Sequence, residues 1–268
     1  MDKRSRRKRY RTDGIYTRQP AARVTTHNFL RKEKMKKLDG KTAFVTGSSR
    51  GVGRLVAVAL AEQGCSTVIC HGRTEEACQA TAQDVVNAGA TALIVAGELS
   101  DPAQVERIAD RVLEMGGVDI LYNNAAIQQG WHDNLEEHTQ EEWARIFQVN
   151  VFALVRLTVK LVHHMRERKW GRIVNLTSGI DKTPQLAAYG ASKWAVDKWT
   201  DDLAAELKGS GVIVSRLDPG WLSTDLGGPN ADNKPETVLP GALVPALLAD
   251  DAEGGQFFRA QEHREYQL

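Results

Sequence analysis

The sequence has few residues that could cross-link the chain through disulfides or anchor it in a membrane. It has only three cysteines in 268 residues, Cys65, Cys70 and Cys78, an odd number without zinc-ligand spacing. We therefore expect reduced, mostly packed thiols, which excludes a disulfide framework. No apolar run approaches the roughly 18 residues of a membrane span, and no signal-peptide-like segment precedes the main body. We expect a cytoplasmic protein that neither spans a membrane nor is secreted.

Clustered metal ligands are also scarce in the sequence. The pair His163-His164 has no acidic or cysteine partner at ligand spacing. Imidazoles in such a setting are more often solvated surface groups than metal ligands. We therefore predict no metal site.

Net charge is almost absent as well, but its distribution is uneven. Residues 1–38 carry fourteen Lys/Arg and three Asp/Glu, a net charge of +11, whereas residues 39–268 carry 21 and 31, a net charge of −10; together they give the +1 of the whole chain. We divide the chain into a basic N-terminal arm, 1–38, and a domain, 39–268, that is long enough to be a catalytic domain. The cluster at 4–11 could bind polyanions. We favour a solvated or subunit-clasping arm over an alternative start at Met35, and both of these over nucleic-acid binding.

Three glycines form the first informative motif. Gly47, Gly51 and Gly53 lie between a short β-rich apolar segment, 42–46, and a longer helix-compatible one, 55–60. A strand that turns tightly into a helix lets phosphates approach bare N–H groups where side chains are absent. The helix N-terminus adds about half a positive charge at the same place. This motif predicts a dinucleotide-binding turn.

Two further clusters follow, and together the three resemble the short-chain dehydrogenase/reductase family. They are Asn123-Asn124-Ala125-Ala126 and Tyr189-Gly190-Ala191-Ser192-Lys193, the latter preceded by Ser178. The resemblance runs from about residue 38 to about residue 259. It implies a doubly wound α/β Rossmann fold, a single domain with a parallel sheet of about seven strands flanked by helices.

The alternation of apolar segments agrees with that fold. Asp101 and Pro102 have the residue types of an N-cap and a first helical position, and Thr139 with Glu142 forms a capping-box pattern. We expect strands at 42–46, 67–71, 90–96, 118–122, 172–176, 212–217 and 256–259, with long helices at 139–168 and 186–208.

Tyr189 and Lys193 are spaced i,i+4, so on a helix their side chains share a face. An ammonium about 5 Å from a phenol contributes roughly 3 kcal/mol at an effective dielectric near 20, which would lower the phenol pKa by about two units. Tyr189 is then a general acid for carbonyl reduction and a base for the reverse reaction. The resemblance adds Ser178 to hold the substrate oxygen, Asn150 to support a water-linked proton relay, and a contact from Lys193 to the nicotinamide ribose.

The cofactor is predicted to be NADP(H) rather than NAD(H). After the second strand, the position where an NAD enzyme usually has a carboxylate is Gly72, followed by Arg73, and Arg50 lies in the phosphate loop. Two guanidiniums and no acid suit a 2′-phosphate, although both could instead be solvated surface arginines. By resemblance, the cofactor-binding residues are Gly47, Ser49, Arg50, Gly51, Val52, Gly53, Arg73, Glu98, Leu99, Asn124, Ala125, Ala126, Tyr189, Lys193, Pro219, Gly220 and Thr224.

Several features bear on the substrate. Trp131 and Trp221 are candidates for substrate contacts, with loop packing as an equal alternative. The segment 225–240 is rich in Gly, Pro and Asn, as in a mobile lid. Ala126 and Glu98 stand where the family usually has Gly and Asp, and the eleven positions from Ser178 to Tyr189 are fewer than the usual thirteen or so. These departures leave specificity open.

The resemblance implies an NADP(H)-dependent oxidoreductase that reduces a ketone or aldehyde, of the 3-oxoacyl- or carbonyl-reductase type. An oxidative dehydrogenase of a polyol, sugar or steroid alcohol is the alternative among enzymes. A non-catalytic NADP-binding regulator that uses the basic arm is the alternative of another class. The resemblance also implies a homodimer or homotetramer formed through the helices at 139–168 and 186–208.

Overall fold

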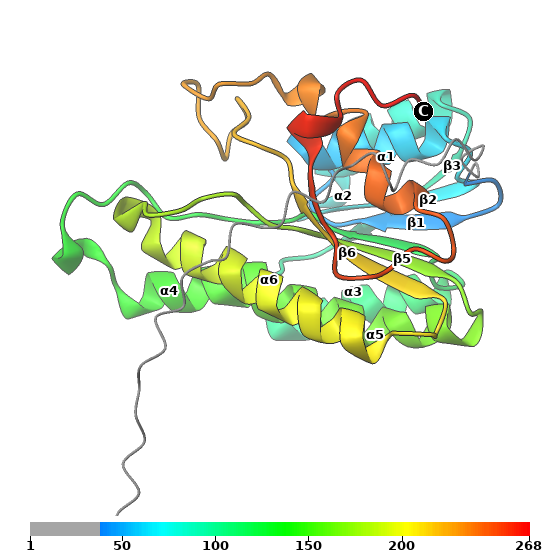
Figure 1. Cartoon of the computed structure of the whole chain (residues 1–268), viewed down its shortest axis with the longest axis horizontal. Coiled ribbons are helices and arrows are strands. Elements are labelled where there is room, and N and C mark those ends of the chain that lie inside the picture. Colours follow the sequence, from blue (N-terminus) through cyan, green and yellow to red (C-terminus); the bar gives the residue numbers. More distant parts are fainter. Residues whose placement is uncertain (1–37) are drawn as a thin grey trace, which may run out of the picture. The chain divides into compact units, whose positions relative to one another are not determined.

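Seven parallel strands form one sheet in the computed structural model, which describes residues 38–268 (Figure 1). The order is β3-β2-β1-β4-β5-β6-β7, so the direction of winding reverses between β1 and β4. The strands are β1 (Thr42–Val45), β2 (Thr67–Gly72), β3 (Thr91–Ala96), β4 (Ile120–Asn123), β5 (Gly171–Leu176), β6 (Val212–Asp218) and β7 (Phe257–Arg259). The predicted fold class is confirmed. Apart from Leu38, the predicted basic arm 1–38 lies outside the described residues.

Helices cover both faces of the sheet (Figure 1). They are α1 (Gly51–Glu62), α2 (Glu75–Asn87), α3 (Pro102–Glu114), α4 (Gln140–Phe147), α5 (Leu154–Glu167) and α6 (Ala187–Glu206). Short 3₁₀ turns occupy Leu135–Glu137, Pro184–Leu186, Pro235–Val238, Gly241–Leu247 and Ala260–His263. α1 and α2 lie on one face, and α3, α4, α5 and α6 lie on the other.

Alternation along the strands divides the core into two clusters. In β1, Ala43 and Val45 pack into the cluster beneath α1 and α2, whereas Phe44 packs into the cluster beneath α3 and α5. Successive side chains of a strand point to opposite faces, so a strand covered on both faces is apolar throughout. Cys65 and Cys70 are buried free thiols in the first cluster, and burial raises the pKa of each to about 12. Cys78 is buried as well, so the predicted packing of the cysteines is confirmed.

The two predicted helix starts differ in outcome. Asp101 caps α3 by accepting hydrogen bonds from the N–H groups of Ala103 and Gln104, at 2.8 and 3.3 Å, and this prediction is confirmed. Thr139 caps α4 by accepting from the N–H of Glu142 at 3.2 Å. The Glu142 carboxylate does not complete a capping box, because it bonds to a histidine ring of the preceding loop instead.

The predicted long helix at 139–168 has the right extent but is not regular. A π-helical segment, Gln148–Ala153, joins α4 to α5. By length and composition alone, the continuous stretch Gln140–Glu167 could cross a membrane, a possibility that the search for uninterrupted apolar runs missed. Half of its most apolar part is buried inside the fold. Core helices of α/β domains commonly have this composition. The composition and the half burial of Gln140–Glu167 therefore do not distinguish a core helix from a membrane-spanning helix.

Candidate active site

The candidate site lies at the carboxyl ends of the strands, where the strand order reverses. The glycine loop follows β1, and the Asn123–Ala126 cluster begins at the end of its neighbour β4. In open α/β sheets, ligands bind in the crevice outside such a switch point. The fold therefore brings the first two sequence motifs together.

The glycine loop has the shape of an anion cradle. Gly47 and Gly51 have positive φ angles of +63° and +57°, which side-chain-bearing residues rarely adopt. A Cβ on Gly53 would lie 2.4 Å from the Gly47 carbonyl oxygen, so only glycine lets α1 start this close to the strand. Within the described residues α1 has no side-chain N-cap bond, and its first turn has no acid. Its free N–H groups therefore fit a pyrophosphate.

Hydrogen bonds of Asn124 and Thr46 hold this loop in place. The Asn124 side-chain amide donates to the carbonyl oxygens of Thr46 and Gly47, at 2.8 and 3.1 Å. The Thr46 hydroxyl accepts from the N–H groups of Asn124 and Ala125, both at 3.0 Å. The predicted cofactor residue Asn124 thus holds the backbone that forms the cradle, and Ala126 follows it in the same segment.

His71 braces the loop from the side, a role that was not predicted from the sequence. Its Nδ1 accepts from the N–H of Gly47 at 3.1 Å, and its Nε2 lies 3.2 Å from the carbonyl oxygen of Gly97. The backbone of His71 also exchanges bonds with Ser48. Burial lowers the pKa of the imidazole to about 4, so it is neutral at physiological pH. A polar ring at the end of an otherwise apolar strand was the signal available in the sequence.

The predicted 2′-phosphate region has two exposed arginines. Arg50 forms an ion pair of 2.9 Å with Asp225, and both side chains are about 70% exposed. Arg73 is exposed directly after Gly72. A Cβ on Gly72 would lie 2.6 Å from the Cys78 sulfur, so any side chain at this position requires Cys78 to move.

The remaining predicted cofactor residues lie around the same crevice. Leu99 is buried in the core, and the Glu98 carboxylate accepts from the N–H of Ser100 at 3.4 Å. The Pro219 carbonyl accepts from the Gln261 amide at 2.8 Å, and Gly220 has a φ of +82°. Thr224 lies beside the cradle, 3.6 Å from the position of a Cβ on Gly51. Ser49 and Val52 belong to the cradle itself.

The predicted catalytic residues converge from three elements. Ser178 follows β5, and its hydroxyl accepts from the N–H of Ile180 at 3.2 Å. It lies close enough to Tyr189 on α6 to lower the pKa of the phenol. Lys193, one turn further along α6, donates to the Leu176 carbonyl oxygen at 2.8 Å, with its Nζ 5.7 Å from the centre of the Tyr189 ring.

Asn150 lies in the π-helical segment and joins that segment to Ile127, in the loop after β4, and to Ser192 on α6. Its amide nitrogen donates to the carbonyl of Ile127 and to the hydroxyl of Ser192, at 2.8 and 2.9 Å, and its oxygen accepts from the N–H of Ile127 at 2.8 Å. The structure therefore connects Asn150 to α6 through Ser192 and shows no direct bond to Lys193 among the described residues. A water-linked relay between Asn150 and Lys193 remains a prediction.

The pKa values of Tyr189 and Lys193 differ from the expectation based on their i,i+4 spacing. The pKa of Tyr189 is raised to about 12, chiefly by burial; the Ser178 hydrogen bond lowers it and the charge of Asp218 raises it. Burial lowers the pKa of Lys193 to about 8, against the charges of Asp197 and Asp218. The expected net lowering of the phenol pKa is therefore not found, because burial of the phenol is the largest influence on that pKa.

Asp218 is the second residue that sequence reasoning missed. It is 8% exposed, and its carboxylate accepts from the N–H of Gly220 at 2.9 Å. A Cβ on Gly179 would lie 2.7 Å from the same carboxylate. Burial raises its pKa. This acid joins the segment after β6 to the segment after Ser178.

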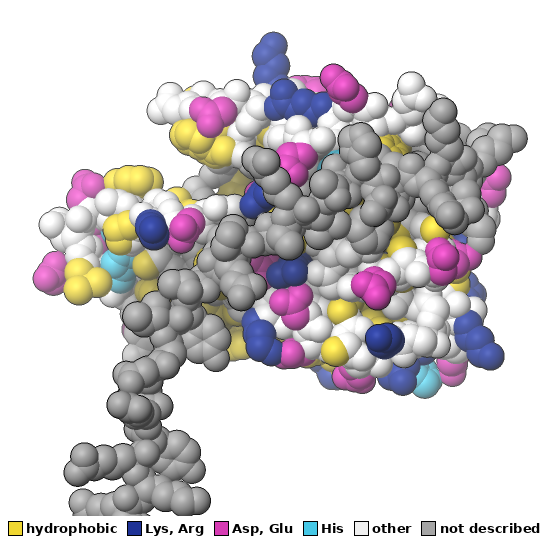
Figure 2. Space-filling model, viewed as in Figure 1, with side chains coloured by type: hydrophobic (Ala, Val, Ile, Leu, Met, Phe, Trp, Pro, Cys, Tyr) yellow, Lys and Arg dark blue, Asp and Glu magenta, His cyan; other side chains and the backbone are white. Residues whose placement is uncertain are grey.

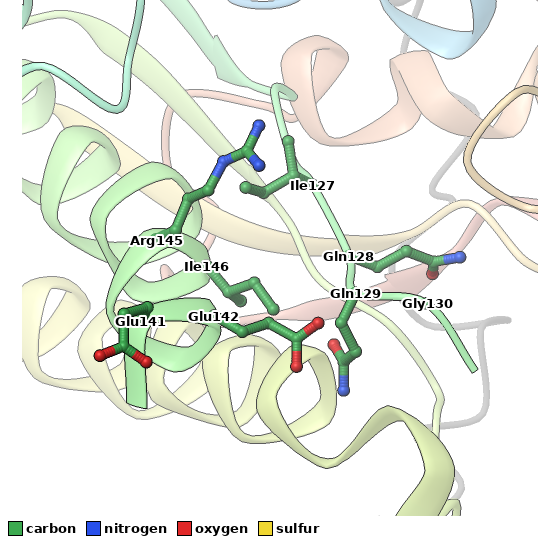
Figure 3. A pocket seen from close by; sticks show the side chains of 8 residues that line it. All are labelled: Ile127, Gln128, Gln129, Gly130, Glu141, Glu142, Arg145 and Ile146. Carbon is green, nitrogen blue, oxygen red and sulfur yellow. The ribbon is translucent and has the colours of Figure 1, made fainter. Parts of the chain in front are cut away.

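Two open cavities flank the catalytic residues. The larger, about 480 Å³, is lined by Ile127, Gln128, Gln129, Gly130, Glu141, Glu142, Arg145 and Ile146. Figure 3 shows the Gln129 and Glu142 side chains pointing toward one another across it. The smaller, about 300 Å³, is lined by residues between Ile180 and Trp194. Gln129 links the larger cavity to the catalytic helix, because its side-chain oxygen accepts from the N–H of Tyr189 at 3.2 Å.

The predicted substrate residues lie outside both cavities. Trp131 and Trp221 are 60% and 52% exposed. Trp131 donates to Asp133 at 2.9 Å and Trp221 to the carbonyl of Gly227 at 2.8 Å, so each fastens its own loop. The segment predicted as a lid is held in part, since Ser223 donates its N–H to the Asn233 carbonyl at 2.8 Å and Val238 is buried.

The chain is similar to known proteins in sequence and in fold. A family model described as short chain dehydrogenase matches residues 41–235. A short chain dehydrogenase of Pseudocercospora fijiensis is 36% identical over 72% of this chain and 63% of its own length. The 3-oxoacyl-(acyl-carrier-protein) reductase FabG of Vibrio cholerae is 37% identical over 81% of this chain and 87% of its own. The crystal structure of a 3-oxoacyl-(acyl-carrier-protein) reductase from Agrobacterium tumefaciens C58 with NADP bound is 28% identical, covers 86% of this chain and 96% of that one, and superposes with a TM-score of 0.75.

Proposed function

This chain belongs to the short-chain dehydrogenase/reductase family, and from that premise we propose that it is an NADP(H)-dependent reductase of a ketone or aldehyde. The family acts on carbonyl and alcohol groups with a nicotinamide cofactor, which supplies the hydride. The observation that carries the proposal is the convergence of Ser178, Tyr189 and Lys193 beside the glycine cradle.

The residues of the chain have separate tasks in this reaction. The Ser178 hydroxyl, which lies close enough to Tyr189 to lower its pKa, holds the substrate oxygen next to the phenol. A phenol with a pKa of about 12 is protonated at physiological pH, so Tyr189 is ready to donate a proton to the oxygen as it gains charge. Lys193 stabilises the tyrosinate that remains.

The preference for NADP(H) rests on three features of the crevice. Gly72 offers no carboxylate to the ribose, and Arg50 and Arg73 are exposed. The ion pair of Arg50 with Asp225 is exposed, and such pairs contribute only about 0–1 kcal/mol. A 2′-phosphate can therefore replace Asp225 at little cost. The Agrobacterium relative with NADP bound supports the same choice.

The substrate class that we propose is a 3-oxoacyl or related ketone, as in the Vibrio relative. The test is a panel of 3-oxoacyl thioesters, simple ketones and aldehydes with NADPH and NADH, followed by the absorbance of the reduced nicotinamide. The matching alcohols with the oxidised cofactors form the reverse arm. Reduction faster with NADPH for at least one carbonyl class supports the proposal. Oxidation of polyols, sugars or steroid alcohols with no reduction of carbonyls would contradict it.

We also propose that the enzyme is a homo-oligomer that pairs through α5 and α6. Val159 on α5, Phe152 just before it and Trp194 on α6 are large exposed apolar side chains on these elements. Isologous interfaces of this kind bury apolar helix faces against their own copies. Light scattering should show a dimer or tetramer, and Val159→Glu should shift the mass toward the monomer. A monomeric wild type at micromolar concentration would overturn this part.

A further inference from the structure

A compact set of metal-ligand side chains lies in the loop between β4 and α4, outside the catalytic residues. Ligand atoms of His132, His138 and Glu142 all lie within 4.8 Å of one another, and all three side chains are partly buried. Their His-x5-His-x3-Glu spacing was overlooked in the sequence, where only His163-His164 was considered. Two imidazoles and one carboxylate are the ligand set of several zinc sites.

The geometry of the triad suits a small divalent cation. The Nε2 of His132 lies 2.7 Å from a carboxylate oxygen of Glu142. Ligands bound at about 2.0–2.1 Å lie roughly 3.3 Å apart around a tetrahedral ion, so shifts of about one ångström suffice to admit it. The buried Nδ1 of His138 has no hydrogen-bond partner among residues 38–268, which leaves a lone pair available. An orphaned buried nitrogen of this kind calls for a ligand or an ordered water.

The surroundings favour a cation as well. The other ring nitrogen of His132 faces the Glu137 carboxylate at 3.5 Å, the outer-shell arrangement that orients metal-bound histidines. Residues 131–144 contain five acids and no Lys or Arg. In Figure 2 the projection that contains this loop carries histidine and acidic side chains beside one another.

We propose that His132, His138 and Glu142 bind a zinc-type divalent cation that fastens the loop before α4 to the first turn of that helix. Imidazole ligands select such an ion over magnesium or calcium, which prefer oxygen. Three protein ligands leave one position for water. Since Glu142 also lines the larger cavity, the ion would fix one wall of that cavity and the loop that follows Trp131. The site is independent of the proposed reaction.

The first test is calorimetric titration of the full chain, freed of metal with a chelator, with Zn²⁺. We expect one equivalent to bind, and His132→Ala or His138→Ala to abolish that binding. Glu137→Gln should weaken it by about 10–100-fold, as outer-shell changes do. His163→Ala is the matched control, because His163 pairs with Glu167 at 3.0 Å on an exposed surface, with no third ligand among residues 38–268. Loss of zinc in this control as well, or equal binding in all variants, would overturn the proposal.

A second measurement does not depend on how the histidine variants fold. A crystal of the wild-type protein grown with Zn²⁺ should show an anomalous difference peak within bonding distance of the three side chains. Zn²⁺ should also slow cleavage after Glu136 and Glu137 by a glutamate-specific protease in the wild type but not in Glu142→Gln. A peak elsewhere, or cleavage unaffected by Zn²⁺ in the wild type, would show that the triad is only a hydrogen-bonded cluster.

Discussion

The loop after β1 and the segment after β6 both border the crevice, but they are held in different ways. The β1 loop is fixed by bonds from Thr46, His71 and Asn124, two of which are buried side chains. The segment after β6 combines two buried apolar residues, Leu222 and Val238, with contacts of exposed side chains, including the Arg50–Asp225 pair and the Trp221 bond to Gly227. The exposed contacts of this substrate half can therefore rearrange at less cost than the bonds of the cofactor half around the β1 loop, which are built into the core.

The largest effect is expected where the two halves meet, at Tyr189. Replacement by Phe removes the proton donor but keeps the buried ring, so turnover should fall by about 10²–10⁴-fold while NADPH binding changes little. Steady-state kinetics and cofactor titration by fluorescence measure the two properties. Substantial turnover by purified Tyr189→Phe protein would remove Tyr189 from the mechanism.

The second-largest effect is expected when the two exposed arginines of the cofactor half, Arg50 and Arg73, are removed. Arg50→Ala with Arg73→Ala should weaken NADPH binding by about 10²-fold and leave NADH binding nearly unchanged, since charge-assisted bonds to phosphate contribute about 1.5–3 kcal/mol each. Asp225→Ala is the matched control: it breaks the ion pair but keeps Arg50, so NADPH affinity should hold or rise. Equal losses for both cofactors in the double variant would contradict the NADP assignment.

A smaller effect should appear in the dependence of stability on pH. The folded chain keeps His71 neutral, with its pKa lowered from 6.5 to about 4, while the unfolded chain protonates it below pH 6.5. The stability from this group is therefore complete above about pH 6.5, and about 1.4 kcal/mol is lost for each pH unit between there and about pH 4.

Urea unfolding at several pH values tests this window. His71→Gln should be less stable at neutral pH, because the bond to Gly47 is disturbed, but its stability should fall less steeply below pH 6.5. His163→Ala, on the exposed surface, should keep the wild-type slope. A slope unchanged in His71→Gln would show that His71 does not titrate as the structure requires.

The smallest effect is expected from removal of the basic arm. A chain starting at Met35 keeps every residue of the cradle and the catalytic cluster, so its kinetic constants should stay within about threefold of the full chain. Steady-state kinetics and light scattering of the two proteins give the comparison. Loss of assembly, or a tenfold rise in KM, would make the arm part of the enzyme.

Sequence reasoning predicted the features that depend on local pattern. The βα alternation, the cap at Asp101 and the glycine turn each arise within a few residues, so the sequence alone specified them. The predicted strand limits lie close to those found; the third strand begins at Thr91 rather than Ala90, for example. These elements also fix which loops meet at the carboxyl edge of the sheet.

The features that it missed depend on contacts between distant residues. His71 and Gly47 are 24 positions apart, and nothing local in either indicates that one accepts a bond from the other. The direction of the Tyr189 pKa shift was predicted wrongly because its largest cause is burial, which sequence spacing does not reveal. The cluster of His132, His138 and Glu142 is different, because it spans only ten positions and its spacing was visible in the sequence but overlooked.

The π-helical segment Gln148–Ala153 sets the angular phase between α4 and α5. A wide turn contains one more residue than an α-helical turn, so it rotates everything that follows by about 100° relative to a regular helix. With that residue deleted, the buried side chains of α5 and the exposed Val159 would all turn by about 100° around the helix axis, even though no contact residue had changed. At its exposed positions this stretch should therefore tolerate substitutions better than changes of length, and a one-codon deletion here would act on the sheet face and on the outer face of α5 at once.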